Sequence, residues 1–284
     1  MPGRDSRGWG YVLPALAWTL AFFVLPFLLM ACYSLWRFEG GKVLHVWTFE
    51  NYEAFIARPH FHEALVNSLE VTALTVVLSV LLAYPLAWIL AFRVPAHLQR
   101  IALVLAVLPF WTSYLVRSYS WLLVLSDRGV INSALLAAGI IETPLELAHN
   151  RGATVLGFTH FFTMLLTLTI FASLVQINPH YHAAAADLGA SRLRIFLRIT
   201  LPLSLPGVVV GAFLTFVVAV GDFITPQILG GGTELLMPQA IMLQISRYVD
   251  LPMASAMSLI LMAVVTLVFL ACARWLKVRS PVSP

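Results

Sequence analysis

Three ionisable residues lie within or beside long apolar segments, and they are the first candidates for chemistry in this sequence. Arg117 interrupts one apolar segment, Glu70 begins another, and Asp222 directly follows a third. Charged groups at membrane depth are costly and commonly serve a function. We therefore expect Glu70 and Asp222 to line an outer vestibule and to attract a positively charged solute.

Aromatic side chains close to Arg117 in the sequence could take part in the same site. Four residues offer ring faces, which attract cations through the ring quadrupole: Trp111, Tyr114, Tyr119 and Trp121. A structural role is also open: Arg117 could pair with one of the two acids, and the rings could form an interfacial belt. An arginine in the pathway would disfavour a polyamine and favour a solute that carries a carboxylate.

The sequence contains no constellation of residues typical of an enzyme. A phosphate-binding loop of the form GxxxxGK[ST] is absent, because Gly41-Lys42-Val43 lacks both the first glycine and the final hydroxyl residue. The two close histidine pairs, at positions 60 and 62 and at 180 and 182, lack further ligands at metal spacing. We expect no catalytic residue, and neither a metal nor a cofactor bound by this chain.

The composition indicates which elements must position these residues. Of the 284 residues 60% are hydrophobic and only 11% are charged, whereas a soluble domain carries about 25% charge. Since about 20 apolar residues cross a bilayer as a helix, we predict an all-α, polytopic membrane protein with one transmembrane domain, residues 1–284. Its six spans are expected at about 11–36, 65–92, 101–126, 152–177, 200–222 and 251–275. Residues 129–141 are apolar but too short, and favour an interfacial or re-entrant helix.

The distribution of charge predicts the orientation of the spans. With the N-terminus inside, the inner segments carry ten basic and two acidic residues, and the outer segments seven basic and eleven acidic ones. Basic residues concentrate on the cytoplasmic side of membrane proteins, so both termini are expected in the cytoplasm. The basic residues form no long run, and nucleic acid is not expected as a partner.

The inner segment between the fourth and fifth spans, about 178–199, has a distinctive local pattern. Pro179 can begin a helix, and the alanines that follow favour it. Gly189 suits a left-handed turn, and Ser191 can cap a second, basic helix. The pattern predicts a helix, a turn and an amphipathic helix at the inner surface, where arginines could contact anionic lipid.

The spacing in this segment resembles a family signature. Ala184-Ala185, Gly189 and the run Ile199–Pro202 match the EAA signature of importer-type ABC transporter permeases, which reads Glu-Ala-Ala, three residues, Gly, nine residues, Ile-x-Leu-Pro. Ala183 stands where the family has glutamate. Residues 108–117 and 221–231 are similar to regions of spermidine/putrescine-type permeases, and the resemblance covers roughly residues 65–275.

The resemblance implies a type I ABC importer permease fold in a bacterial inner membrane. It implies as partners a second permease, in a heterodimer, a cytoplasmic ATPase dimer that uses ATP and Mg, and a periplasmic substrate-binding protein. The cargo would be a polyamine, spermidine or putrescine, or a similar small organic solute. Coupling to the ATPase is carried over onto Ala183, Ala184, Ala185, Asp187, Leu188, Gly189, Ala190 and Ser191.

Three other classes of function compete with this interpretation. A secondary transporter that works without an ATPase would have acids at mid-membrane and usually internal repeats. A membrane enzyme would need a nucleophile and base or a metal cluster, and a scaffold would need only its lipid-bound basic segment. The residues alone leave open the exact solute, the choice between homodimer and heterodimer, and which spans line the pore.

Overall fold

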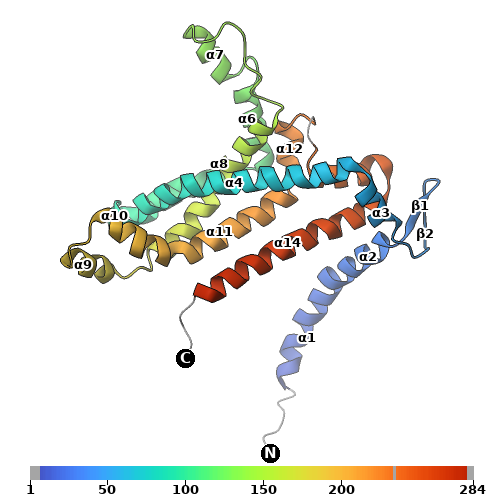
Figure 1. Ribbon diagram of the computed structural model, residues 1–284, viewed down its shortest axis with the longest axis horizontal. Coiled ribbons are helices and arrows are strands. Elements are labelled where there is room, and N and C mark those ends of the chain that lie inside the picture. Colours follow the sequence, from blue (N-terminus) through green and yellow to red (C-terminus); the bar gives the residue numbers. More distant parts are fainter. Residues whose placement is uncertain (1–6, 233–234, 280–284) are drawn as a thin grey trace, which may run out of the picture. The chain divides into compact units, whose positions relative to one another are not determined.

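The apolar segments form helices in the computed structural model, which describes residues 7–232 and 235–279 (Figure 1). Five helices are long and apolar enough to span a membrane, and a bent pair of helices makes up to six. The five are Val12–Ser34, Pro59–Phe92, Arg151–Leu174, Arg192–Gly221 and Leu251–Arg274. The chain divides into two compact units, Met1–His62 with Ala240–Val264 and Glu63–Gln239 with Val265–Pro284.

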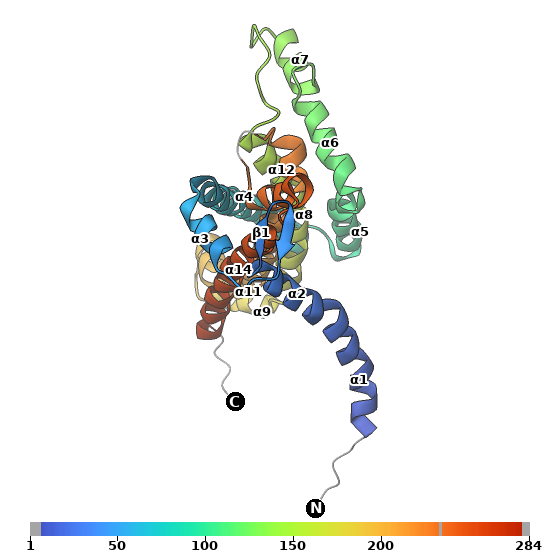
Figure 2. The same ribbon diagram turned by 90° about the vertical axis from the view of Figure 1, so that its right-hand side faces the viewer.

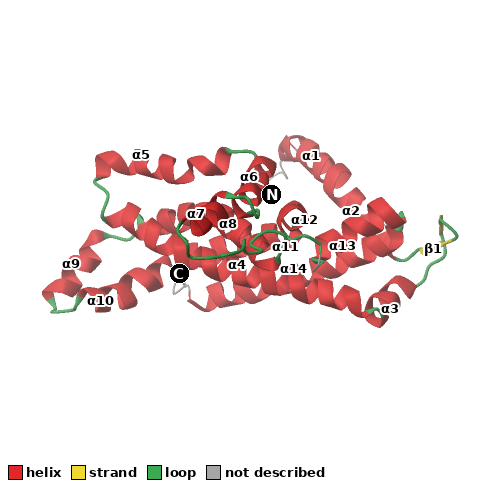
Figure 3. Ribbon diagram, turned by 90° about the horizontal axis from the view of Figure 1, so that it is seen from above, coloured by secondary structure: helices red, strands yellow, loops and turns green. Residues whose placement is uncertain are grey.

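The first unit begins with a continuous helical span, whose parts are α1 (Arg7–Thr19), the π-helical η1 (Leu20–Val24) and α2 (Leu25–Ser34). A hairpin follows, in which β1 (Arg37–Glu39) pairs antiparallel with β2 (Lys42–Leu44). The expectation of an all-helical chain did not include this hairpin, which is drawn in yellow at β1 in Figure 3. Its turn is Gly40-Gly41, with φ angles of 58° and 77° that glycine adopts without steric cost.

Polar contacts fix the segment after the hairpin to the end of the first span. In α3 (Glu50–Ala57), the Asn51 amide donates to the carbonyls of Ser34 and Trp36, both at 2.8 Å. The first unit also contains the end of α13 (Met237–Leu243), η4 (Gln244–Tyr248) and the start of α14 (Leu251–Arg279). Asp250 caps α14, because its Oδ1 accepts from the Met253 N–H at 2.9 Å.

The second unit is built on α8 (Arg151–Leu174), which packs against α4 (Pro59–Phe92) and α11 (Leu201–Gly221), as Figures 1 and 2 show. Ala83 and Ala87 of α4 are buried against aliphatic side chains of α8. Gly207 of α11 lies so close to α8 that a Cβ atom would come within 2.5 Å of the Ser173 Cβ and 2.8 Å of the Thr169 carbonyl oxygen. The Gly207-xxx-Gly211 pair is therefore a packing contact within this chain.

The third predicted span is broken. It consists of α5 (Ala96–Val107), the 3-10 turn η2 (Leu108–Trp111), α6 (Tyr114–Leu125) and α7 (Val130–Ala137). The two halves, Ala96–Trp111 and Tyr114–Ala137, differ in direction by 85°, and Figure 3 shows α5 crossing the view while α6 is seen close to its axis. Pro109 lacks an N–H and Thr112 is extended, with φ −72° and ψ 149°, so the helix cannot continue.

Four shorter elements complete the second unit. They are α9 (Pro179–Asp187), α10 (Arg192–Ile195), the π-helical η3 (Phe196–Thr200) and α12 (Ile224–Leu229). The first three join α8 to α11, and α12 follows α11 after a break at Asp222. Two helices begin before the predicted spans: α4 begins at Pro59, ahead of the expected 65, and the helix that enters the fifth span begins at Arg192, ahead of the expected 200.

Candidate functional site

The segment between α8 and α11 has the helix, turn and helix that its sequence predicts. The Asn178 side chain accepts from the His180 N–H at 3.0 Å and caps α9. Gly189 ends that helix with a φ of 78°, and the Ser191 hydroxyl caps α10 by accepting from the Arg194 N–H. Each feature has its cause in one residue type, so the local prediction is confirmed.

The tip of this segment is exposed. No residue of α9 is buried, and Leu188, which follows it, has 88% of its surface accessible. Leu188 is therefore available for contact with a partner. The eight residues expected to couple to an ATPase lie in α9 or in the turn that runs from it to Ser191, the cap of α10, so they share one projecting knob.

His182 fixes α9 to the bundle on its other side. Its Nε2 lies 3.1 Å from the Thr200 hydroxyl, and its ring meets the Phe92 ring edge-on with centroids 5.5 Å apart. Thr200 is buried at the start of the fifth span, and Phe92 ends α4. His182 therefore connects α9 to the ends of two spans.

Glu70 is paired within the chain. Its Oε2 lies 2.5 Å from a guanidinium nitrogen of Arg151, at the start of α8, and both side chains are partly exposed. The sequence pattern indicated Glu70 as a candidate but not its partner, because Arg151 is 81 positions away in the chain. The pair reduces the net charge that Glu70 offers to a cation.

The Asp222 carboxylate accepts hydrogen bonds from three donors. It accepts from the N–H of Ile224 at 2.9 Å and of Thr225 at 3.3 Å, which caps α12. The Tyr114 hydroxyl bonds to the same carboxylate and to the Thr225 hydroxyl. The structure thus brings Tyr114 and Asp222 together, as partners that join α6 to α12.

Arg117 contacts backbone rather than an acid. It is 7% exposed, and its Nη2 donates to the carbonyls of Pro109 at 2.7 Å and Thr112 at 3.0 Å, both at the helix break. Its guanidinium also lies 4.9 Å from the centroid of the Phe161 ring. The alternative of an ion pair with Glu70 or Asp222 is wrong, since no salt bridge of Arg117 occurs in 7–232 and 235–279. Its Nε and Nη1 have no hydrogen-bond partner there.

Three of the four predicted aromatic residues, Trp111, Tyr119 and Trp121, do not join this cluster through a hydrogen bond or ring contact in the described part of the chain. Trp111 is 84% exposed and Tyr119 55% exposed, which suits a surface belt. Sequence reasoning missed His160, whose Nδ1 accepts from the Trp121 indole N–H at 3.1 Å. An imidazole within an apolar span was the available signal.

Comparison with known families gives a match over nearly the whole chain. The family described as "Binding-protein-dependent transport system inner membrane component" matches residues 11–279. The chain is 32% identical over 260 residues to the spermidine/putrescine transport system permease protein PotB of Escherichia coli strain K12, covering 91% of this chain and 94% of that protein. It is also 32% identical over 272 residues to the molybdenum transport system permease protein ModB of Mycobacterium bovis, with 95% and 94% covered.

Solved structures show the same fold. A chain of a bacterial ABC transporter involved in the import of the acidic polysaccharide alginate superposes with a TM-score of 0.75 at 18% identity, covering 96% of this chain and 95% of that one. The same kind of transporter in complex with an alginate pentasaccharide-bound periplasmic protein gives 0.76 at 17% identity, with 95% and 93% covered. At this identity the likeness concerns the fold alone.

Proposed function

Since this chain belongs to the family of binding-protein-dependent transport system inner membrane components, we propose that it couples solute import to a separate ATPase through the knob formed by α9 and the turn after it. The chain is an ABC importer permease and a multi-pass membrane protein, a transporter subunit rather than an enzyme. The secondary transporter weighed above is therefore set aside.

The observation that carries this proposal is the exposed, rigid knob at Leu188. Caps at Asn178 and Ser191 fix the helices on either side of its turn, and His182 connects it to two spans. A stiff element with small alanines and one exposed leucine can enter a groove of a partner and transmit rigid-body motion. Ala183 is exposed and brings no carboxylate, so the acidic contact of this segment falls to Asp187.

The partners follow from the same assignment. We propose a cytoplasmic ATPase dimer that uses ATP and Mg, a second permease in a heterodimer, and a periplasmic binding protein that delivers the solute. The periplasmic protein in the alginate transporter complex supports the last of these. The chain would then lie in a bacterial inner membrane with both termini in the cytoplasm, the side on which ATP is available.

For the cargo we propose a polyamine such as spermidine or putrescine. The similarity to PotB supports this choice, as does the cluster of Tyr114, Phe161 and Asp222, which presents aromatic rings beside a carboxylate. A second candidate is an anionic solute. Arg117 favours it, because two of its nitrogens have no partner in the described residues and no acid neutralises it, and the equal identity to the molybdenum permease agrees.

Uptake in reconstituted vesicles distinguishes these proposals. The tagged chain is co-expressed with the transporter genes that neighbour its own gene, purified, and tested for ATP-dependent uptake of labelled putrescine with unlabelled dicarboxylate or molybdate as competitor. Putrescine uptake that neither anion inhibits supports the polyamine; uptake of an anion and not of putrescine contradicts it. Uptake without ATP would contradict the assignment of the chain to an ATPase-driven importer.

Replacing Leu188 tests the coupling knob itself. Leu188→Arg leaves the fold intact, because the side chain is 88% exposed, but it places a charge in the groove that the leucine would fill. We expect the ATPase to be lost on purification and uptake to fall at least about tenfold, since 1.4 kcal/mol of lost contact suffices for that. Val46→Arg, at a 56% exposed site after the hairpin, should retain the ATPase. Equal retention by both variants would place coupling elsewhere.

A further inference from the structure

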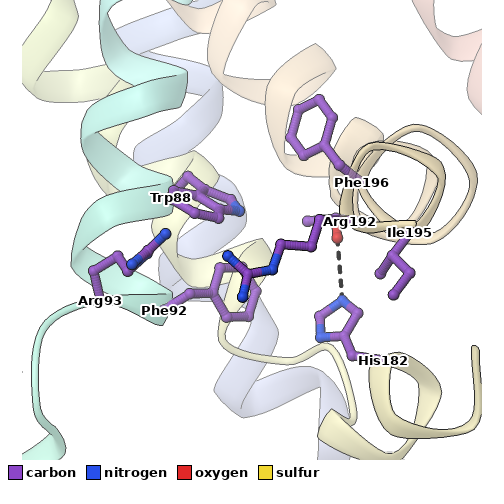
Figure 4. A pocket seen from close by; sticks show the side chains of 8 residues that line it. Trp88, Phe92, Arg93, His182, Arg192, Ile195 and Phe196 are labelled. Atoms are coloured by element: carbon purple, nitrogen blue, oxygen red, sulfur yellow. Dashed lines mark hydrogen bonds between the residues drawn. The ribbon is translucent and has the colours of Figure 1, made fainter. Parts of the chain in front are cut away.

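A basic pocket lies behind the coupling knob, between the end of α4 and the start of the fifth span. It has a volume of about 460 Å³, within the range of small-molecule sites. Its walls come from α4 and the residue after it, from α9, and from α10 with η3 (Figure 4). The lining residues are Trp88, Phe92, Arg93, His182, Arg192, Ile195, Phe196 and Thr200.

Two arginines give this pocket its charge. Figure 4 shows the guanidinium groups of Arg93 and Arg192 extending from opposite walls toward the same space. The Arg93 guanidinium lies 5.5 Å from the centroid of the Trp88 ring, which orients it. No acidic side chain lines the pocket, and in the part of the chain that the structure describes neither arginine forms a salt bridge. Two convergent cations without an acid attract an anion.

The remaining walls are apolar and aromatic. Phe196 is partly buried and meets the Tyr84 ring edge-on with centroids 5.8 Å apart, and Ile195 is partly buried beside it. The Phe92 ring lines the pocket between the two arginines, as Figure 4 shows. A ligand that fits must therefore have an anionic group and an adjoining apolar part.

We propose that this pocket binds the phosphate of an anionic phospholipid, with the start of an acyl chain along Ile195 and Phe196. Arg93 directly follows the apolar helix α4, so the pocket opens at the boundary where apolar residues give way to charged ones, the level of lipid headgroups. Guanidinium groups bond phosphate oxygens in pairs, and basic pockets between spans on this side of a membrane suit anionic headgroups.

Such a lipid would act on the position of the coupling knob. Its phosphate would bridge Arg93, after α4, and Arg192, at the start of α10. This bridge would lie beside the hydrogen bond between the His182 Nε2 and the Thr200 hydroxyl, which are 3.1 Å apart. The lipid would therefore favour the packed arrangement of α9 against the spans. This inference concerns the chain by itself and does not depend on which solute is transported.

Native mass spectrometry of the full chain tests the proposal. The chain in detergent is titrated with phosphatidylglycerol, with phosphatidylcholine and with inorganic phosphate. We expect retention of phosphatidylglycerol over phosphatidylcholine, and no displacement by millimolar phosphate, which lacks an acyl chain. In the double variant Arg93→Gln/Arg192→Gln, the affinity for phosphatidylglycerol should fall about thirtyfold. Each arginine is expected to contribute a similar share of the electrostatic binding free energy, and the variant removes both.

Arg194→Gln is the matched control, because Arg194 lies on the same helix as Arg192 but outside the pocket. It should bind phosphatidylglycerol as the wild type does, and thermal unfolding of all three proteins shows that each is folded. Equal loss in Arg194→Gln, equal binding of both lipids, or displacement by inorganic phosphate would overturn the proposal. So would unchanged lipid binding in the double variant together with loss of the ATPase, which would assign the arginines to a protein partner.

Discussion

Two of the three charged residues selected from the sequence, Arg117 and Asp222, bond to backbone and hydroxyl groups. Arg117 donates to carbonyls that the broken third span exposes, and Asp222 accepts from two N–H groups that begin α12. Each charge therefore compensates a helix end, where four backbone groups lack partners. A residue that both terminates a helix and faces a vestibule affects stability and transport together, and variants must separate the two effects.

The variant Tyr114→Phe separates the effect on stability from the effect on transport at the Asp222 cluster. The variant retains the ring against Phe161 and removes the hydroxyl that bonds Asp222 and Thr225. Since a hydrogen bond to a charged group contributes about 1.5–3 kcal/mol, we expect a loss of this size in the free energy of unfolding, seen as a lower midpoint of thermal unfolding in detergent. Tyr119→Phe, at a 55% exposed ring, should leave the midpoint unchanged.

Asp222→Asn completes a double-mutant cycle with Tyr114→Phe. The asparagine can still accept from the Ile224 N–H, so the cap of α12 is retained. The two changes should be strongly non-additive, because they remove the same bond. Additive losses would show that the bond contributes nothing, and full uptake by Asp222→Asn would remove this carboxylate from the solute pathway.

Residue type and depth predict that a charge matters, but not which partner it has. Glu70, Arg117 and Asp222 stood out from the sequence because so few charged residues interrupt the spans. Their partners did not, since Arg151 is 81 positions from Glu70 and Tyr114 is 108 from Asp222. Local signals such as Asn178, Gly189 and Ser191 act over a few residues, and they predicted the helix, turn and helix between α8 and α11 correctly.

At the scale of elements, close approach of α8 and α11 accounts for Gly207 and Gly211 of the fifth span. Gly207→Ala forces α8 and α11 apart, because the added carbon would come within 2.8 Å of the Thr169 carbonyl oxygen, a backbone atom. We expect a loss of about 1–3 kcal/mol in stability. Gly221→Ala in the same helix meets no atom within 4 Å and should be neutral or slightly stabilising. If Gly207→Ala left unfolding unchanged and abolished pairing with the second permease, the contact would be intermolecular.

The cap of α14 has a pH dependence that follows from its burial. Burial raises the pKa of Asp250 above its usual 3.8, while the Met253 N–H and the nearby Arg58 act in the opposite direction. The folded state therefore binds the proton more tightly than the unfolded chain, and Asp250 lowers stability as the pH rises from 3.8 through the higher folded value. Asp250→Asn retains the cap without the charge, so it should unfold at a higher temperature at pH 7 than the wild type. The difference should vanish below pH 3.8, and a constant difference would exclude burial of the charge as its cause.

For the whole molecule, the distribution of charge and the coupling knob make one joint prediction. Ten basic and two acidic residues fall on the side assigned to the cytoplasm, and the knob at Leu188 is on that side. With Cys32 and Cys272 replaced by serine, Leu188→Cys and Val46→Cys each provide a single thiol at an exposed site.

An impermeant maleimide added to intact spheroplasts should label Val46→Cys and should reach Leu188→Cys only after the membrane is opened. The reverse pattern would contradict the positive-inside assignment. It would also contradict the coupling proposal, because a knob outside the membrane cannot meet an ATPase that uses cytoplasmic ATP. One labelling experiment therefore tests both the orientation of the chain and the location that coupling requires of Leu188. Neither the solute nor the partner proteins need to be known for it.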